Sequence, residues 1–145
     1  MDALVDSMKK SLATSFAFYL KAQYYHWNVE GPDFKQYHDL FGGIYEEVYG
    51  SIDTFAEEIR ALNAYSPGSL KRFSELSAIQ DENQIPDNIT MAKRLLDDTA
   101  IVIVLLKQTF DFSEQFGEVG LSDFLAGRID AFKKHAWMLR ASTKI

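Results

Sequence analysis

Residues 37–62, YHDLFGGIYEEVYGSIDTFAEEIRAL, carry an apolar side chain at nearly every third or fourth position. This spacing gathers the apolar side chains on one side of an α-helix, and the run is too long for an ordinary strand. We therefore expect an amphipathic helix from about Asp33 to Ala64. Its apolar positions are Tyr37, Phe41, Ile44, Tyr45, Val48, Ile52, Phe55, Ala56, Ile59 and Leu62.

The same periodicity recurs on both sides of this segment. It predicts a first helix over residues 3–25, a third from Asp87 or Thr90 to Phe116, and a fourth from Ser122 to the C terminus. Either Asp87 or Thr90 suits the N-cap of the third helix, and Gly117 suits its end. Residues 100–106, AIVIVLL, would by themselves also suit a buried strand. Their helical flanks favour the most buried part of the third helix.

Four amphipathic helices in 145 residues predict an all-α, single-domain four-helix bundle over residues 1–145. The connection between the second and third helices, from Tyr65 to Pro86, is long for a compact domain. Residues 70–76 within it predict a short extra helix. A long crossover in the middle of a bundle is the connection that ferritin-like folds use.

The composition excludes several classes of site and partner. The chain has no cysteine, so disulfides, thiolate metal sites and thiol nucleophiles are excluded, and His and carboxylates remain as the strong metal ligands. The net charge of −6 argues against nucleic-acid binding. No apolar run is long enough to span a membrane, and the N terminus has no signal-peptide pattern. We therefore expect a cytoplasmic protein with no membrane partner.

The candidate metal ligands are His26, His38, Asp53 and Glu57. Two imidazoles and two carboxylates suit iron, because nitrogen ligands bind Fe(II) and hard oxygens favour Fe(III). Asp53 and Glu57 are four residues apart and share a helix face, but His38 and Asp53 are separated by about 22 Å of helix. Around the helix axis, His38 and Asp53 differ by only about 60°. Antiparallel pairing of two copies would therefore build two shared sites, with the two-fold axis near Glu46 and Glu47.

From the residues alone, other readings remain open. A lone histidine at a helix end is more often a structural hydrogen-bonding group, and carboxylates four residues apart are common on solvated helices. His135 suits a structural or surface role better than metal binding. Glu46 and Glu47 suit either mineral nucleation or plain surface.

The motif HWNVEGPDF at residues 26–34, followed by His38 and by DTFAE at residues 53–57, resembles the signature of the Dps family, or miniferritins. KHAWMLRA at residues 134–141 resembles the last helix of that family. The resemblance implies a dodecameric cage built from two-fold dimers, in which iron is oxidised with hydrogen peroxide or O2 and stored as ferric mineral. It implies iron at an inter-subunit site, no haem, and protection against oxidative damage. His26 and His38 would come from one chain and Asp53 and Glu57 from its mate, with Trp27 donating electrons to stray oxidant.

The chain departs from the family pattern at Gly42. Family members usually carry an acidic residue at this position, four residues after the second histidine. We therefore expect one well-formed iron position and a second that is weak or completed by water. Alternatively, Gly42 and Gly43 allow helices to approach closely at the two-fold axis, and the two interpretations are compatible.

Two rival functions follow from the same resemblance. The first is a DNA-binding, nucleoid-protecting protein, and the second is a cage whose metal site has degenerated. Against the first, Lys9 and Lys10 lie on the expected first helix instead of a flexible arm, and twelve chains would carry a charge of about −72. Acidic pores would instead attract Fe(II), and Glu114, Glu118 and Asp123 are candidates for lining them.

Overall fold

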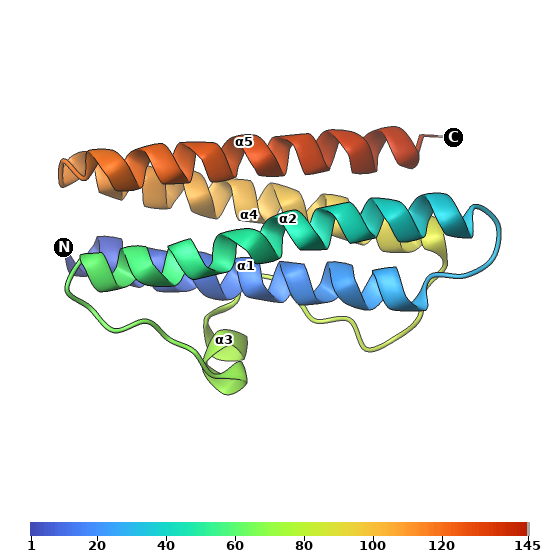
Figure 1. Ribbon diagram of the computed structural model, residues 1–145, viewed down its shortest axis with the longest axis horizontal. Coiled ribbons are helices and arrows are strands. Elements are labelled where there is room, and N and C mark those ends of the chain that lie inside the picture. The colour runs from blue at the N-terminus through green and yellow to red at the C-terminus, as the bar shows by residue number, and fades with distance from the viewer. Residues whose placement is uncertain (145) are drawn as a thin grey trace.

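The computed structural model describes residues 1–144, which form five α-helices (Figure 1). Residue 145, the last of the expected domain, lies outside the described residues. The helices are α1 (Asp2–Asn28), α2 (Phe34–Ala61), α3 (Leu70–Leu76), α4 (Asn88–Gln115) and α5 (Val119–Ser142).

The four long helices form a bundle of two antiparallel hairpins, α1 with α2 and α4 with α5 (Figure 1). The crossover from α2 to α4 runs the length of the bundle, so these two helices point the same way. The short helix α3 lies within the crossover, over α1. The expected all-α, ferritin-like four-helix bundle with an extra crossover helix is therefore confirmed.

The helix ends follow local signals, but several boundaries shift: α1 continues three residues beyond the expected residue 25, and α2 ends three residues before the expected Ala64. Asp87 is the N-cap of α4, because its carboxylate accepts a hydrogen bond of 2.8 Å from the backbone N–H of Thr90. Gly117, at φ 68°, turns the chain after α4. The last helix begins at Val119, three residues before the expected Ser122.

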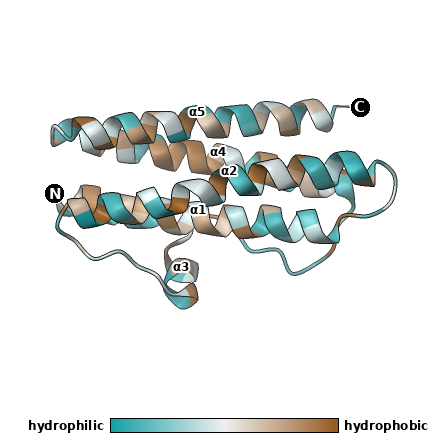
Figure 2. Cartoon of the chain, viewed as in Figure 1, coloured by the Kyte–Doolittle hydropathy of each residue, from teal (hydrophilic) through white to brown (hydrophobic). Residues whose placement is uncertain are grey.

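The core is built from buried aromatic and aliphatic side chains of all four long helices. Along these helices hydrophobic residues alternate with hydrophilic ones (Figure 2). The rings of Phe18 in α1 and Phe132 in α5 meet edge to face at 5.0 Å, and those of Phe55 in α2 and Phe124 in α5 at 4.8 Å. No helix formed by residues 1–144 has the length and apolar content needed to cross a bilayer.

The run from Ala100 to Leu106 is helical, but the expectation that it is the most buried part of its helix is wrong. Val102, Leu105 and Leu106 are buried, whereas Ile101 is 42% and Val104 58% exposed. A helix turns 100° per residue, so seven consecutive apolar residues cover its whole circumference. Only one side of α4 faces this bundle, and the remaining apolar side chains lie on the outer side.

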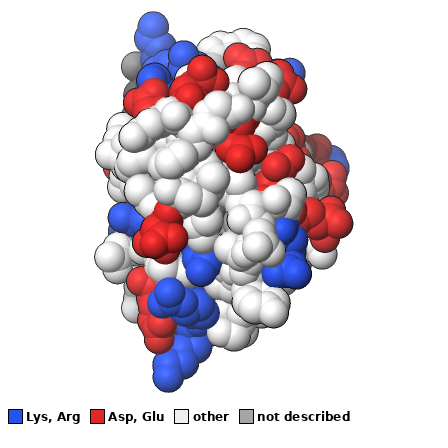
Figure 3. Space-filling view, turned by 90° about the vertical axis from the view of Figure 1, so that its left-hand side faces the viewer, with Lys and Arg blue, Asp and Glu red and all other residues white. Residues whose placement is uncertain are grey.

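Charged side chains of both signs lie on the end of the bundle near the N terminus, separated by uncharged surface (Figure 3). Lys9 and Lys10 belong to α1, which begins at Asp2, so neither lysine is on an arm among the described residues.

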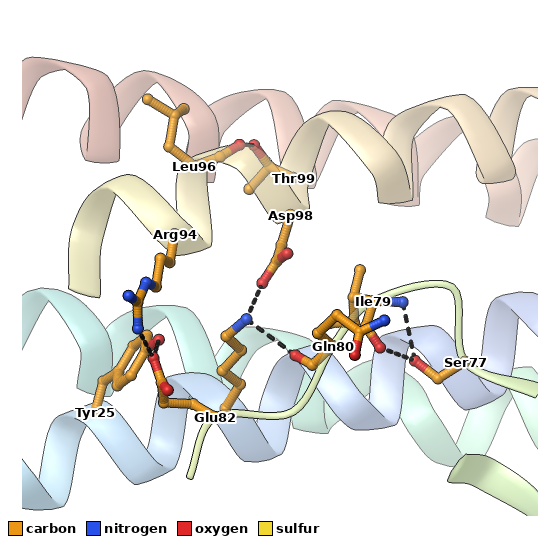
Figure 4. Close-up of polar contacts among 10 residues, drawn as sticks. Tyr25, Ser77, Ile79, Gln80, Glu82, Arg94, Leu96, Asp98 and Thr99 are labelled. Carbon is orange, nitrogen blue, oxygen red and sulfur yellow. Dashed lines mark hydrogen bonds and ion pairs between the residues drawn. The ribbon is translucent and has the colours of Figure 1, made fainter. Parts of the chain in front are cut away.

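The crossover is fixed to the bundle by a buried ion pair between α1 and α4. The ammonium group of Lys21 lies 2.8 Å from Asp98 and also donates to the carbonyl oxygen of Gln80, 3.0 Å away (Figure 4). Both side chains are almost fully buried. Burial raises the pKa of Asp98, and the nearby Lys21 only partly opposes this shift.

Glu82 provides a second attachment of the crossover. Its carboxylate accepts a hydrogen bond of 2.8 Å from the Tyr25 hydroxyl and pairs with Arg94 of α4 (Figure 4). Burial and the bond to Glu82 raise the pKa of Tyr25. The segment of the crossover between α3 and α4 (residues 77–87), called the strap below, is thereby held along α1.

Candidate metal centre

A short turn between α1 and α2 brings the two candidate histidines together. The chain leaves α1 at Val29 in an extended conformation, and Gly31 at φ 90° and Asp33 at φ 63° reverse its direction. A glycine adopts such a positive φ without steric cost. The last turn of α1 consequently lies against the first turns of α2. His26 and His38, twelve residues apart in sequence, become neighbours.

The imidazole rings of His26 and His38 stack, with centroids 3.8 Å apart and an angle of 14° between their planes. Each Nδ1 lies 2.7 Å from the backbone carbonyl oxygen of the other histidine. A carbonyl oxygen only accepts hydrogen bonds, so each Nδ1 carries the proton and donates it. The two rings are thus held by a reciprocal pair of hydrogen bonds.

This arrangement leaves both Nε2 atoms available. Neither Nε2 takes part in a hydrogen bond within the described part of the chain. When a carbonyl oxygen accepts the Nδ1–H of a neutral imidazole, the Nε2 lone pair points in a fixed direction. Histidines that bind metals are commonly oriented in this way. His26 and His38 therefore fit the role of nitrogen ligands to a metal such as Fe(II).

Asp53 and Glu57 do not join the histidines within the chain. Both carboxylates are exposed on the second half of α2. Among residues 1–144, no group of three or more His, Cys, Asp or Glu side chains is close enough to hold a metal ion. The chain by itself supplies a pair of histidines and, farther along α2, a separate pair of carboxylates.

Gly42 lies directly against the His26 ring, a neighbour that sequence reasoning did not foresee. The residue is buried, and a Cβ atom built on it would lie 3.0 Å from both Cε1 and Nδ1 of His26. The expected close helix approach at Gly42 therefore involves α1 of the same chain. Gly43, by contrast, is exposed and has no neighbour within 4 Å of an added Cβ.

Aromatic side chains surround the outer side of the histidine pair. The Tyr45 ring lies 5.2 Å from that of His26, and the Tyr19 ring lies 4.8 Å from that of Tyr49. Burial, and then the neighbouring Tyr49 and Tyr45 hydroxyls, raise the pKa of Tyr19.

Trp27 is 62% exposed and lies on the rim of a groove of about 570 Å³. The groove is formed by α1 and the crossover, and its apolar lining includes Phe16, Leu20, Leu70 and Phe73.

Glu47 and His135 belong to a separate cluster that joins α2 to α5. Both terminal nitrogens of Arg128 donate to the Glu47 carboxylate, at 2.6 and 3.0 Å, and the Nε2 of His135 lies 2.8 Å from it. Burial of Glu47 alone would raise its pKa, but the hydrogen bonds and positive charge of these partners lower it to about 2. His135 is buried and structural, as one reading of the sequence held, and Glu47 is engaged in this cluster.

Among residues 1–144, the candidate pore residues do not form a group that could hold a metal ion. Glu114 is exposed near the end of α4, Glu118 is the N-cap of α5, and Asp123 is exposed in the first turns of α5. Their role at a pore stays a prediction.

Comparison with known proteins shows the family to which the chain belongs. The model of the ferritin-like domain matches residues 5–144. DNA protection during starvation protein 2 of Bacillus anthracis is 30% identical, over 95% of this chain and 94% of that protein. The chain belongs to the Dps family.

Solved Dps structures share the fold over nearly the whole chain. The Dps protein of Thermosynechococcus elongatus superposes with a TM-score of 0.96 at 21% identity, over 99% of this chain and 92% of that one. The Dps protein of Vibrio cholerae O1 gives a TM-score of 0.93 at 26% identity, over 99% and 90% of the two chains. That protein is described as a member of a broad superfamily of ferritin-like diiron-carboxylate proteins.

Proposed function

We propose that this Dps-family chain is an iron-storage ferroxidase subunit of a hollow dodecameric cage. It oxidises Fe(II) with hydrogen peroxide or O2 and sequesters the ferric product as mineral. With peroxide, two ferrous ions and two protons yield two ferric ions and two water molecules for each peroxide consumed. Iron is the substrate and cargo of the cage, and its removal together with peroxide protects the cell from oxidative damage.

One observation carries the proposal: His26 and His38 are tethered through Nδ1 with both Nε2 atoms free, yet no carboxylate among residues 1–144 joins them to complete a metal site. Asp53 and Glu57 remain exposed on the same helix, about 22 Å and about 28 Å along it from His38. Antiparallel pairing of two copies about a two-fold axis brings the carboxylates of each copy to the histidines of the other.

The surface beside the histidines supports this pairing. Leu20, Trp27, Tyr49 and Leu70 are large, exposed apolar side chains, and all except Tyr49 line the groove between α1 and the crossover, which reaches Trp27, the residue after His26. Exposed apolar surface of this kind commonly marks a protein interface. A second copy placed over it excludes water from the metal site and leaves Trp27 near the reaction, where it donates electrons to stray oxidant.

The decisive test compares wild-type protein with Asp53→Ala. We expect Asp53→Ala to abolish rapid Fe(II) oxidation after addition of peroxide while particle mass stays unchanged, because one carboxylate ligand is lost and the helix surface is otherwise preserved. Asp97→Ala, an exposed carboxylate on α4, is the matched control and should oxidise iron at the wild-type rate. Equal rates in Asp53→Ala and wild type would favour a cage with a degenerate metal site.

A further inference from the structure

Phe34, the first residue of α2, lies against the histidine pair from outside. Its ring stacks on the ring of His38, with centroids 5.1 Å apart and an angle of 23° between the planes. His26 stacks on the same imidazole at 3.8 Å. A ring in van der Waals contact fills the face that it covers, so Phe34 takes the other face of His38. The imidazole of His38 is thus enclosed between two flat rings.

The position of Phe34 follows from the helix itself. Phe34 and His38 are four residues apart on α2, so their side chains lie one above the other on the same helix face. The column continues past His26 to Tyr45, whose ring lies 5.2 Å from that of His26. Phe34 forms the outer end of the column, because its side chain is 43% exposed. It therefore separates the histidine pair from solvent on that side.

This enclosure limits how the His38 ring can rotate. Rotation about the Cβ–Cγ bond would carry the Nδ1–H of His38 away from the His26 carbonyl oxygen, which accepts it at 2.7 Å. A rotating flat ring sweeps through the space on both of its faces. His26 fills one of those spaces and Phe34 the other. Without Phe34, the outer face would open to water, which would compete for the Nδ1–H, and the Nε2 lone pair would lose its fixed direction.

We propose that Phe34 is a positioning residue for His38: its stacked ring prevents rotation of the imidazole and keeps Nε2 pointing in the direction that binds the metal. Phe34 itself supplies no ligand. This inference rests on the proposed function, because the direction of Nε2 matters for activity when His38 binds a metal.

The first measurement reads the position of the ring without any metal. Hydrogen–deuterium exchange at the histidine Cε1–H, followed by mass spectrometry on assembled protein, reports how freely solvent reaches each imidazole. We expect His38 to exchange about three- to tenfold faster in Phe34→Ala than in wild type, the factor that corresponds to one lost aromatic stack. His135, buried between α2 and α5, is the internal reference and should exchange at the wild-type rate.

Three further variants separate a stacked ring from plain apolar cover. Phe34→Tyr keeps an aromatic face and should behave as wild type does. Phe34→Leu keeps an apolar side chain without a flat ring and should behave as Phe34→Ala does. Phe116→Ala is the matched control, because it removes a phenylalanine of similar exposure, 38%, at the opposite end of the bundle (Figure 1), and it should leave His38 unchanged.

The second measurement titrates Co(II) into the same assembled proteins, in buffer without peroxide, by calorimetry and visible absorption. We expect Phe34→Ala and Phe34→Leu to bind Co(II) about three- to tenfold more weakly than wild type, with altered ligand-field bands, because a ligand that is free to rotate must be ordered on binding. Phe34→Tyr should restore both the affinity and the spectrum.

Several outcomes would overturn the inference. Wild-type exchange of His38 in Phe34→Ala would show that the stack does not hold the ring, and wild-type Co(II) affinity would show that the stack does not matter to the metal. Recovery of exchange, affinity and particle mass in Phe34→Leu would assign Phe34 to apolar contact between copies. No Co(II) binding by wild type, or no loss in His38→Ala, would instead overturn the proposed function, while exchange in metal-free protein would still decide what Phe34 does.

Discussion

His26 and His38 hold each other through backbone carbonyl oxygens, so their orientation depends on how α1 and α2 pack. Each Nδ1 donates across the helix pair at 2.7 Å. A carboxylate acceptor would have placed a negative charge beside the imidazole ring, whereas a carbonyl oxygen orients the ring without adding a charge. Any movement of α1 along α2 would disturb both rings together.

Glu47 links α2 to α5 through its contacts with Arg128 and His135. Arg128 and His135 are almost fully buried, and Glu47 itself is 40% exposed. Removing its charge would leave the Arg128 guanidinium without its anionic partner in a buried position. The cluster fastens two helices that otherwise have little direct contact.

The pKa of Glu47, about 2 in the folded chain against an ordinary 4.5, makes its contribution to stability depend on pH. A lowered pKa stabilises the folded state above the unfolded value, and this contribution is lost as the pH falls from 4.5 toward 2. We expect Glu47→Gln to lower the free energy of unfolding by about 1–2 kcal/mol at pH 7, since Glu47 is partly exposed. The difference from wild type should shrink between pH 4.5 and pH 2.

Urea unfolding over this pH range measures the effect. Glu46→Gln, at the exposed neighbouring position, should change stability by no more than about 0.5 kcal/mol at any pH. A Glu47→Gln difference that persisted unchanged at pH 2 would mean that shape, and not charge, accounts for the contribution of Glu47.

At the level of elements, polar contacts at several points attach the crossover to α1 and α4, the first and third long helices. Lys21 and Asp98 join α1 to α4 beneath it, and Lys21 also holds the Gln80 carbonyl. Since the strap forms one wall of the apolar groove, these contacts also shape the surface proposed to meet a second copy.

Substituting Lys21 with Met tests this attachment. The change leaves the Asp98 carboxylate buried without a positive partner, so we expect a loss of about 3–5 kcal/mol in the free energy of unfolding. Adding Asp98→Leu should restore most of that loss, because the unpaired charge is then removed. Lys93→Met, at an exposed position on α4, should leave stability within about 0.5 kcal/mol of wild type. No recovery in the double variant would assign the loss to the Gln80 contact.

At the scale of the whole molecule, the net negative charge of the chain disfavours the approach of large anionic partners such as DNA. Each chain carries −6, and the lysines nearest the N terminus, Lys9 and Lys10, are fixed on α1. Duplex DNA is itself a dense array of negative charge, and its non-specific binding depends on Lys and Arg neutralising phosphates.

We therefore expect no gel shift of duplex DNA by the assembled protein, even at low salt. Replacing Asp2 and Asp6 with Lys, on the first turns of α1, should raise retention of DNA if repulsion is the cause. A clear shift with wild-type protein at low salt that disappears as salt is added would contradict this expectation. It would also favour the DNA-protecting function suggested by the name of the Bacillus anthracis relative.

The sequence by itself determined the helices, the long crossover with its short helix, and the separation of the candidate metal ligands along α2. Periodicity and helical rise are local properties, so they follow from residue spacing alone. The same reasoning wrongly predicted that Ala100 to Leu106 are the most buried part of α4. An apolar residue type does not reveal whether the side chain is covered by its own chain or by another copy.

Only the tertiary structure decided how the two histidines are held, which side chain lies against position 42, and what Glu47 binds. Each of these depends on the distance and rotation between packed helices: His26 meets Gly42 across α1 and α2, and Glu47 meets Arg128 and His135 across α2 and α5. Residue spacing within one helix contains no information about that relative placement.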